Sequence, residues 1–186
     1  MKSFLNAGFS CLFFLDRSFS DMNIIFEDWL KTSEPYTIAA VYYTGLVNVQ
    51  SSQYSFLPVD YQTINADKPL FLQNWLKKPA SSQSKILILN GFQPDDAPIP
   101  CGVALPYHSE TLLVFPDLPS NNLKLSNVSL FAQCLAEVLT TNNHSFTKVM
   151  QDVRKQVEEK MFRKEGRAQI PYEISTITKE ILMNVE

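Results

Sequence analysis

The chain of 186 residues is poor in the side chains from which metal sites and disulfide frameworks are built, with 3 cysteines and 2 histidines. The cysteines Cys11, Cys101 and Cys134 are odd in number and far apart. This pattern argues against a disulfide framework and fits a reducing compartment. The cysteines and histidines also lack the short spacing of a zinc ligand set. We therefore expect no metal, no cofactor and a cytoplasmic location.

Long apolar runs and strong charge are also missing. No run approaches the about 20 apolar residues of a membrane span, and polar Asn6 and Ser10 interrupt the apolar start of the chain, which has no small-residue cleavage site before Asp16. A net charge of −3 indicates no surface for nucleic acid or an anionic membrane. With 45% hydrophobic and 19% charged residues, the composition is globular. We expect a single domain over residues 1–186.

Short apolar runs rich in β-branched and aromatic residues predict the strands of a buried, mostly parallel sheet. The expected strands are residues 10–15, 37–47, 54–59, 85–89, 111–115 and 172–177. Apolar residues spaced three and four apart predict helices between them. The expected helices are residues 18–31, a short one after Asn65 or Asp67, 127–139 and 145–163. This alternation predicts an α/β layered fold.

In a parallel sheet, chemistry is placed just past the carboxyl ends of the strands. Three such ends can be identified, at residues 44–47, 90–93 and 116–119. None of them combines a nucleophile with a base. The residues alone therefore show no catalytic pair at this edge.

Two of these ends carry a family resemblance. Residues 42–47 (YYTGLV) followed by 54–60 (YSFLPVD) resemble the caspase-like cysteine proteases, especially the paracaspases, in which a strand ends Y-Y-(S/A)-G-H-G and a segment of the form (F/Y)-(L/M)-(I/V)-P-(V/L)-D follows. Residues 85–93 (KILILNGFQ) are similar to the family's second catalytic strand, which ends D-x-C-R. Weaker similarities, such as 129–131 (SLF), keep one register from about residue 4 to residue 182.

The resemblance implies a caspase-like three-layer sandwich, with a mostly parallel sheet and helices on both faces. The family's first strand would fall before Met1, between the strands that correspond to residues 10–15 and 37–43. Its absence would leave backbone groups unpaired on both neighbours. We therefore expect that residues 10–15 pair directly with residues 37–43, that another chain supplies a strand, or that the sequence is a trimmed product.

The departures from the family pattern concern catalysis. The catalytic histidine of the family falls on Leu46 and the nucleophilic cysteine on Phe92, while the acidic residue two before that cysteine falls on Asn90 and the arginine after it on Gln93. A thiol protease needs a thiolate activated by a nearby base. Leu46 cannot act as the base and Phe92 cannot act as the nucleophile, so the resemblance implies a pseudoprotease and not an enzyme.

The first functional hypothesis is a regulatory or scaffolding interaction protein. The resemblance implies a dimer through the final strand, and the partner would be a second copy or another caspase-like protein. Residues 172–177 alternate polar and apolar side chains, as an edge strand does. The interface candidates are Tyr172, Ile174 and Thr176.

Two alternatives stay open. The first is a groove that binds an extended peptide without cutting it, with Leu46 and Phe92 as an apolar floor. Its candidate residues are Gly45, Asn90, Phe115, Pro116 and Asp117. The second is a cysteine peptidase with a relocated pair, Cys101 and His108, in the loop before the third buried strand, where Asp95, Asp96 or Glu110 would orient the histidine.

Overall fold

The computed structural model describes residues 2–32, 38–50, 53–62, 70–76, 84–92, 110–116, 129–141, 145–165 and 171–182. By contacts, the chain divides into two compact units. The first comprises residues 1–13, 124–172 and 178–186, and the second comprises residues 14–123 and 173–177. Each unit is described by itself.

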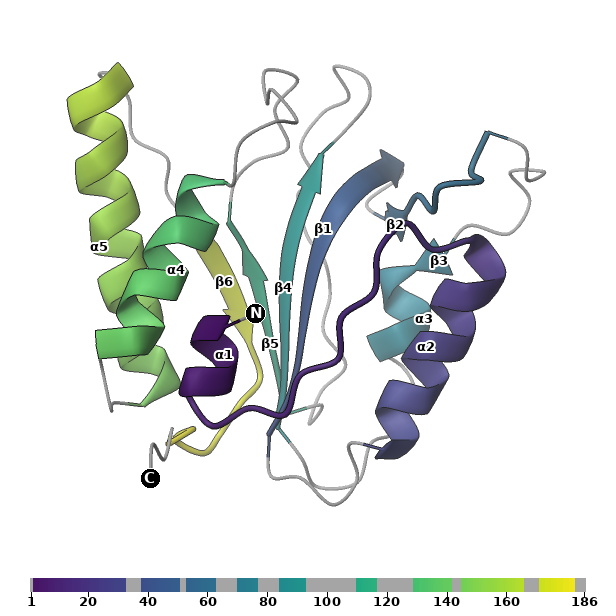
Figure 1. Ribbon diagram of the computed structural model, residues 1–186, viewed down its shortest axis with the longest axis horizontal. Coiled ribbons are helices and arrows are strands. Elements are labelled where there is room, and N and C mark those ends of the chain that lie inside the picture. The colour runs from purple at the N-terminus through teal and green to yellow at the C-terminus, as the bar shows by residue number, and fades with distance from the viewer. Residues whose placement is uncertain are drawn as a thin grey trace. The chain divides into compact units, whose positions relative to one another are not determined.

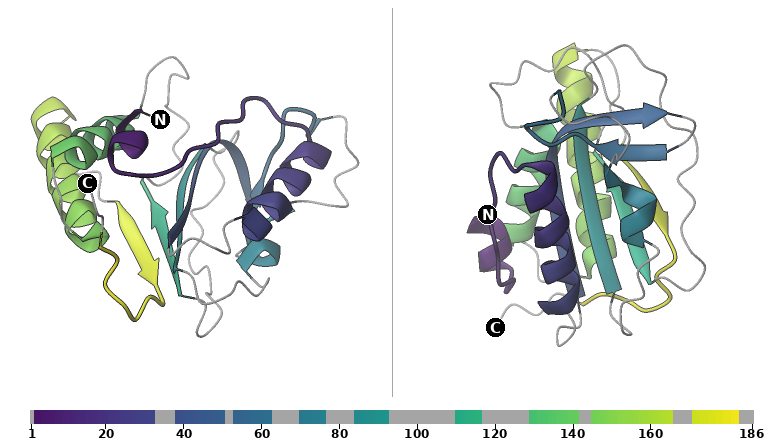
Figure 2. Two further views of the ribbon diagram at one scale, coloured as in Figure 1. Left: turned by 60° about the horizontal axis from the view of Figure 1, so that its bottom comes forward. Right: turned by 90° about the vertical axis from the view of Figure 1, so that its right-hand side faces the viewer.

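The second unit is built on a six-stranded sheet with the order β3-β2-β1-β4-β5-β6 (Figure 1). In its centre β1, β4 and β5 are parallel, while β2 returns antiparallel to β1 and β3 antiparallel to β2. β6 runs against the direction of β5 (Figure 2). The strands are β1 (Ile38–Gln50), β2 (Gln53–Phe56), β3 (Leu70–Phe71), β4 (Ser84–Phe92), β5 (Thr111–Phe115) and β6 (Tyr172–Ser175). The predicted α/β class is confirmed.

The core of this unit lies on the central strands. Every side chain of β5 is buried, and so is every residue from Lys85 to Gly91 of β4. Continuous apolar runs are typical of strands that are covered on both faces. β1 differs, because Ala39 and Val47 are buried while Ile38, Ala40 and Val41 are only half-buried.

Helix α2 (Phe19–Thr32) is fixed at its first turn. The Ser18 hydroxyl oxygen accepts a hydrogen bond from the Asp21 amide at 3.2 Å, as an N-cap residue does. The Asp60 carboxylate accepts one from the Phe19 amide at 3.0 Å, so the turn after β2 is tied to the start of the helix. The same unit contains the short helix α3 (Leu72–Leu76).

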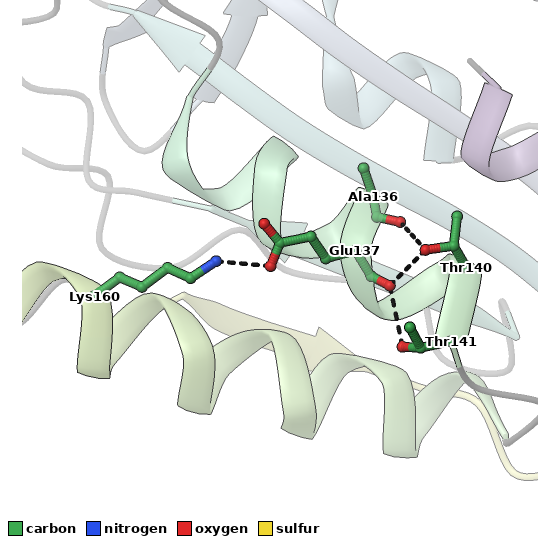
Figure 3. Close-up of polar contacts among 5 residues, drawn as sticks. All are labelled: Ala136, Glu137, Thr140, Thr141 and Lys160. Atoms are coloured by element: carbon green, nitrogen blue, oxygen red, sulfur yellow. Dashed lines mark hydrogen bonds and ion pairs between the residues drawn. The ribbon is translucent and has the colours of Figure 1, made fainter.

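The first unit consists of helices α1 (Lys2–Asn6), α4 (Leu130–Thr141) and α5 (Phe146–Glu165). α4 contacts both α1 and α5. The side chains expected to face inward from α4 and α5 are buried; they are Phe131, Leu135, Val138, Phe146, Val149, Met150, Val153 and Val157. Lys160 of α5 reaches Glu137 of α4 at 2.7 Å, and the hydroxyls of Thr140 and Thr141 donate to carbonyl oxygens one turn earlier (Figure 3).

The expectation of a strand at residues 10–15 is wrong. This segment has no regular structure, and its apolar side chains are largely exposed, with Leu12 at 78% and Leu15 at 62%. A strand is stable only when a neighbouring strand binds its backbone, and no ladder includes this segment in the described part of the chain. Hydrophobicity alone therefore misidentified it, and its expected direct pairing with residues 37–43 does not occur.

Candidate functional site

The carboxyl end of β4 lies beside residues 44–46 of β1, which continues to Gln50. Their parallel ladder pairs Thr44 with Asn90, Gly45 with Gly91, and finally Leu46 with Phe92. Partners in such a ladder lie on adjacent strands about 4.8 Å apart and on the same face. The structure thus brings together the two positions that the resemblance assigns to a base and a nucleophile.

The Tyr43 side chain is bound to the part of β1 that ends the ladder with β4. Its hydroxyl donates a hydrogen bond of 2.7 Å to the Leu46 carbonyl oxygen, which also accepts one from the Leu57 amide at 2.9 Å. Burial raises the pKa of the Tyr43 phenol well above its usual value, and the Leu57 amide opposes this only in part. The phenol is therefore neutral and remains a donor at neutral pH.

Gly45 is required by this arrangement. A Cβ atom at this position would lie 2.7 Å from the Tyr43 hydroxyl oxygen and 3.0 Å from Cζ. Contacts that short would force the Tyr43 ring or the backbone at residue 45 to move. The tyrosine ring therefore occupies the space beside Gly45, where any other residue would place its side chain.

Aromatic side chains of β1, β2 and β5 pack against one another beside this part of the sheet. Tyr43 meets Phe56 at 4.6 Å between ring centroids, Tyr54 meets Phe56 at 5.6 Å, and Tyr54 meets Phe115 at 5.8 Å. All three pairs are edge-to-face, which is a favourable geometry for aromatic rings. We call these residues, Tyr43, Tyr54, Phe56 and Phe115, the aromatic cluster. Tyr54, Phe56 and Phe115 are at most 3% exposed.

The aromatic cluster also covers β4 at Gly91. A Cβ at Gly91 would overlap the Tyr54 hydroxyl and lie 2.7 Å from each methyl carbon of Val47. Only a residue without a side chain fits there. The backbone of β4 is thus packed against Tyr54 one residue before Phe92.

The candidate groove residues are mostly covered. Asn90 is 5% exposed, Phe115 is 3% exposed and Pro116 is buried, while Gly45 is half-buried. Asp117 lies outside the described residues. A peptide lying over the strand ends would therefore reach Gly45 and Leu46 without rearrangement, but not Asn90 or Phe115.

The relocated catalytic pair cannot be placed, because Cys101, His108, Asp95 and Asp96 lie outside the described residues. Glu110 is described, and its carbonyl oxygen accepts a hydrogen bond from the Lys85 amide at 2.8 Å.

The other cysteines are free thiols. Cys11 is half-buried, and Cys134 is fully buried in α4, where burial raises the pKa of its thiol. Within the ranges described, no group of three or more His, Cys, Asp or Glu residues could hold a metal ion. No helix in these ranges is both long and apolar enough to cross a membrane.

Comparison with known proteins bears on the second half of the chain. Residues 105–182 match the family model of the caspase domain. This part of the chain is caspase-like. No curated protein matches the chain.

The caspase-like stretch contains β5, α4, α5 and β6. It starts after Leu46 and Phe92, so the match does not include either position. It does include the three residues expected at a dimer interface. The mixed sheet with a parallel centre is consistent with a caspase-like fold.

The interface candidates of β6 are not equivalent. Tyr172 and Ile174 are half-buried. The Thr176 amide donates to the Thr111 carbonyl oxygen at 2.9 Å, and the Thr176 hydroxyl accepts from the Thr111 amide at 3.1 Å. Thr176 therefore joins the end of this strand segment to β5.

Sequence reasoning missed Tyr43 and Tyr54 as residues that shape the site. One signal was present, because Tyr43 precedes Gly45 by two positions on one face of a strand. The contact between Tyr54 and Gly91 joins residues far apart in the sequence and left no local signal.

Proposed function

We propose that this protein is a catalytically inactive, paracaspase-like member of the caspase-like group that acts as a regulatory or scaffolding interaction protein through dimerisation. The observation that carries the proposal is the ladder pair of Leu46 and Phe92. The two strand ends keep the arrangement in which a base and a thiol would meet, but both side chains are hydrocarbons. Without a thiolate and a base, covalent thiol catalysis has no starting point.

The packing around this pair supports the same proposal. Tyr43 is bonded to the Leu46 carbonyl oxygen, and Tyr54 lies against Gly91. These contacts stabilise the strand ends as part of a packed core. A region that only has to hold its shape can be filled in this way, whereas a working protease needs room there for a scissile bond.

The interaction surface that we assign is β6. It is the terminal strand in the sheet order, so its outer edge can add the same strand of a second copy or of another caspase-like protein. Two copies would pair about a two-fold axis. Tyr172 and Ile174 are half-buried and can gain contacts, while Thr176 holds the strand segment to β5. The free thiols at Cys11 and Cys134 suit a cytoplasmic setting.

The dimer is tested by sedimentation velocity over a range of concentrations. The variant Ile174→Lys places a charge on β6 and is expected to weaken association at least tenfold, because a buried unpaired charge is costly at an interface. The control Gln151→Lys adds the same charge at an exposed position of α5 and should sediment as the wild type. Equal association by Ile174→Lys and the wild type would reject β6 as the interface.

Loss of catalysis is tested with a library of fluorogenic peptides and a thiol-directed peptide warhead. The wild-type protein should neither cleave the peptides nor be labelled. Cleavage that disappears in the variant Cys101→Ala would instead establish the relocated pair. The peptide-binding alternative is tested by titrating extended peptides and following the amide signals of Gly45 and Leu46, which should shift if a peptide binds over them and stay unchanged if none does.

A further inference from the structure

The residue that follows β6 anchors this strand to β5. The Thr176 amide donates a hydrogen bond of 2.9 Å to the Thr111 carbonyl oxygen, and the Thr176 hydroxyl accepts one of 3.1 Å from the Thr111 amide. One threonine therefore binds both backbone groups of Thr111, the first residue of β5. Thr111 is fully buried, so the anchor lies within the sheet.

This anchor determines the direction of the Ser175 backbone. In a planar trans peptide group the C=O and N–H bonds point in opposite directions. The Thr176 N–H points to β5, so the C=O of Ser175, which belongs to the same peptide group, points away from β5. In an extended strand the N–H and C=O groups of one residue face the same edge. Both groups of Ser175 therefore face the outer edge of β6, the last strand in the sheet order.

The side chain of Ser175 suits the close approach of another strand. It is small and exposed, and its hydroxyl oxygen accepts a hydrogen bond of 3.1 Å from the Ile177 amide. Such local bonds from a serine hydroxyl are typical of turns. The bond directs the hydroxyl toward its own chain just after the strand ends, so it does not compete for a neighbouring backbone.

The charge of β6 restricts how two copies can pair. Glu173 is the charged residue of this strand, YEIS. A two-fold axis at Glu173 would set two carboxylates opposite each other, which destabilises a ladder. An axis at Ser175 sets the two serines opposite each other with two mutual hydrogen bonds, and sets Ile174 opposite Thr176 of the second copy. We propose that β6 binds β6 of a second copy about a two-fold axis at Ser175, and that Thr176 is the residue that positions Ser175 for this contact.

This inference rests on the proposed dimerisation through β6 and adds to it a register and a positioning residue. It also identifies the partner as a second copy, because an uncharged residue with both backbone groups directed outward is complementary to itself. Thr176 was expected at the interface for its own contacts. Its hydroxyl is bound to Thr111, so its main effect on the partner is exerted through Ser175.

The register is tested by cysteine substitutions in the full chain, followed by air oxidation. Ser175→Cys should give a disulfide-linked dimer, because residues of a hydrogen-bonded antiparallel pair have Cα atoms about 5.5 Å apart, which a disulfide can span. The controls Glu173→Cys and Ile174→Cys lie off the axis and should link at least tenfold more slowly. Mass spectrometry of the linked peptides distinguishes the new disulfide from any formed by the free thiol of Cys11.

The positioning role is tested with Thr176→Val, which keeps the shape of the side chain but removes its hydroxyl. We expect self-association at least tenfold weaker in sedimentation velocity, with folding checked by circular dichroism, and recovery in Thr176→Ser. The control Thr147→Val makes the same change at an exposed position of α5 and should associate as the wild type.

Amide hydrogen exchange separates positioning from a general loss of stability. In the wild type the Ser175 amide should become protected as the protein concentration rises, whereas the Thr176 amide, which is bonded to β5, should be protected at every concentration. In Thr176→Val the Ser175 amide should lose its dependence on concentration over the range in which the wild type associates.

The outcomes distinguish this inference from the proposed dimer. If Ile174→Lys weakens association but Glu173→Cys or Ile174→Cys links faster than Ser175→Cys, the β6 dimer stands and the register is overturned. A folded Thr176→Val that associates as the wild type would overturn the positioning role alone. A wild type that stays monomeric, or whose association is unchanged by Ile174→Lys, would reject the β6 dimer and this inference with it. The linking of Ser175→Cys does not depend on Thr176→Val folding, because Ser175 is exposed.

Discussion

Leu46 and Phe92 are the last partners of the parallel ladder between β1 and β4. Because ladder partners share a face of the sheet, side chains placed at these positions can touch. Substitutions at positions 46 and 92 can therefore test whether the two positions face each other, even though the residues now present there cannot catalyse a reaction.

The first prediction concerns a thiol placed at position 92. In the double variant Leu46→His/Phe92→Cys, the imidazole should stabilise the thiolate, as paired histidines do in thiol enzymes. We expect alkylation of Cys introduced at position 92 by iodoacetamide at pH 7 to be about tenfold faster than in Phe92→Cys alone, which corresponds to a pKa lowered by roughly one unit. Mass spectrometry assigns the label to each cysteine. Equal rates in the two variants would show that the positions do not face each other.

The second prediction concerns the Tyr43 hydroxyl. Tyr43→Phe removes the hydrogen bond to the Leu46 carbonyl oxygen but keeps the ring. We expect a loss of about 1 kcal/mol in the free energy of unfolding, measured by urea denaturation, since this is the usual contribution of such a bond. The control is Tyr61→Phe, because the hydroxyl of Tyr61 accepts an exposed hydrogen bond from Gln62. Equal losses in both variants would contradict the role assigned to Tyr43.

The third prediction concerns alkaline pH. Burial raises the pKa of Tyr43 above the ordinary tyrosine value of 10.0, so the folded state holds this proton more tightly than the unfolded state. The resulting stabilisation is complete below pH 10.0 and is lost as the pH rises further. We expect the unfolding free energy of Tyr43→Phe to fall less steeply above this pH than that of the wild type. Parallel curves for the two proteins would refute the assignment.

The fold was largely predictable because burial leaves a local signature. The run KILIL in β4 and TLLVF in β5 are continuous and apolar, and both are buried strands. The inward positions of α4 and α5 followed from helical spacing and are buried. Residues 10–15 show the limit of this reasoning, because an apolar segment becomes a strand only when a partner is available for its backbone.

The candidate site was predictable only in outline. The adjacency of Leu46 and Phe92 could be expected because both follow a glycine at the end of a predicted parallel strand. The hydrogen bond from Tyr43 and the packing of Tyr54 on Gly91 depend on how β2 folds back on β1. Such tertiary contacts are set by the ladder register and not by the composition of any one segment. The burial of Asn90, a candidate groove residue, was missed for the same reason.

The fourth prediction concerns the fit between β4 and the aromatic cluster. Gly91→Ala would introduce a methyl group that overlaps the Tyr54 hydroxyl and lies 2.7 Å from the Val47 methyl carbons. We expect a loss of about 1 to 3 kcal/mol in the free energy of unfolding, as is typical of overpacked cores. In the background Tyr54→Phe the same substitution should cost less, because the hydroxyl is gone, but Val47 still prevents full recovery. A double-mutant cycle by urea denaturation measures this coupling, and purely additive losses would show that Tyr54 does not enforce the glycine.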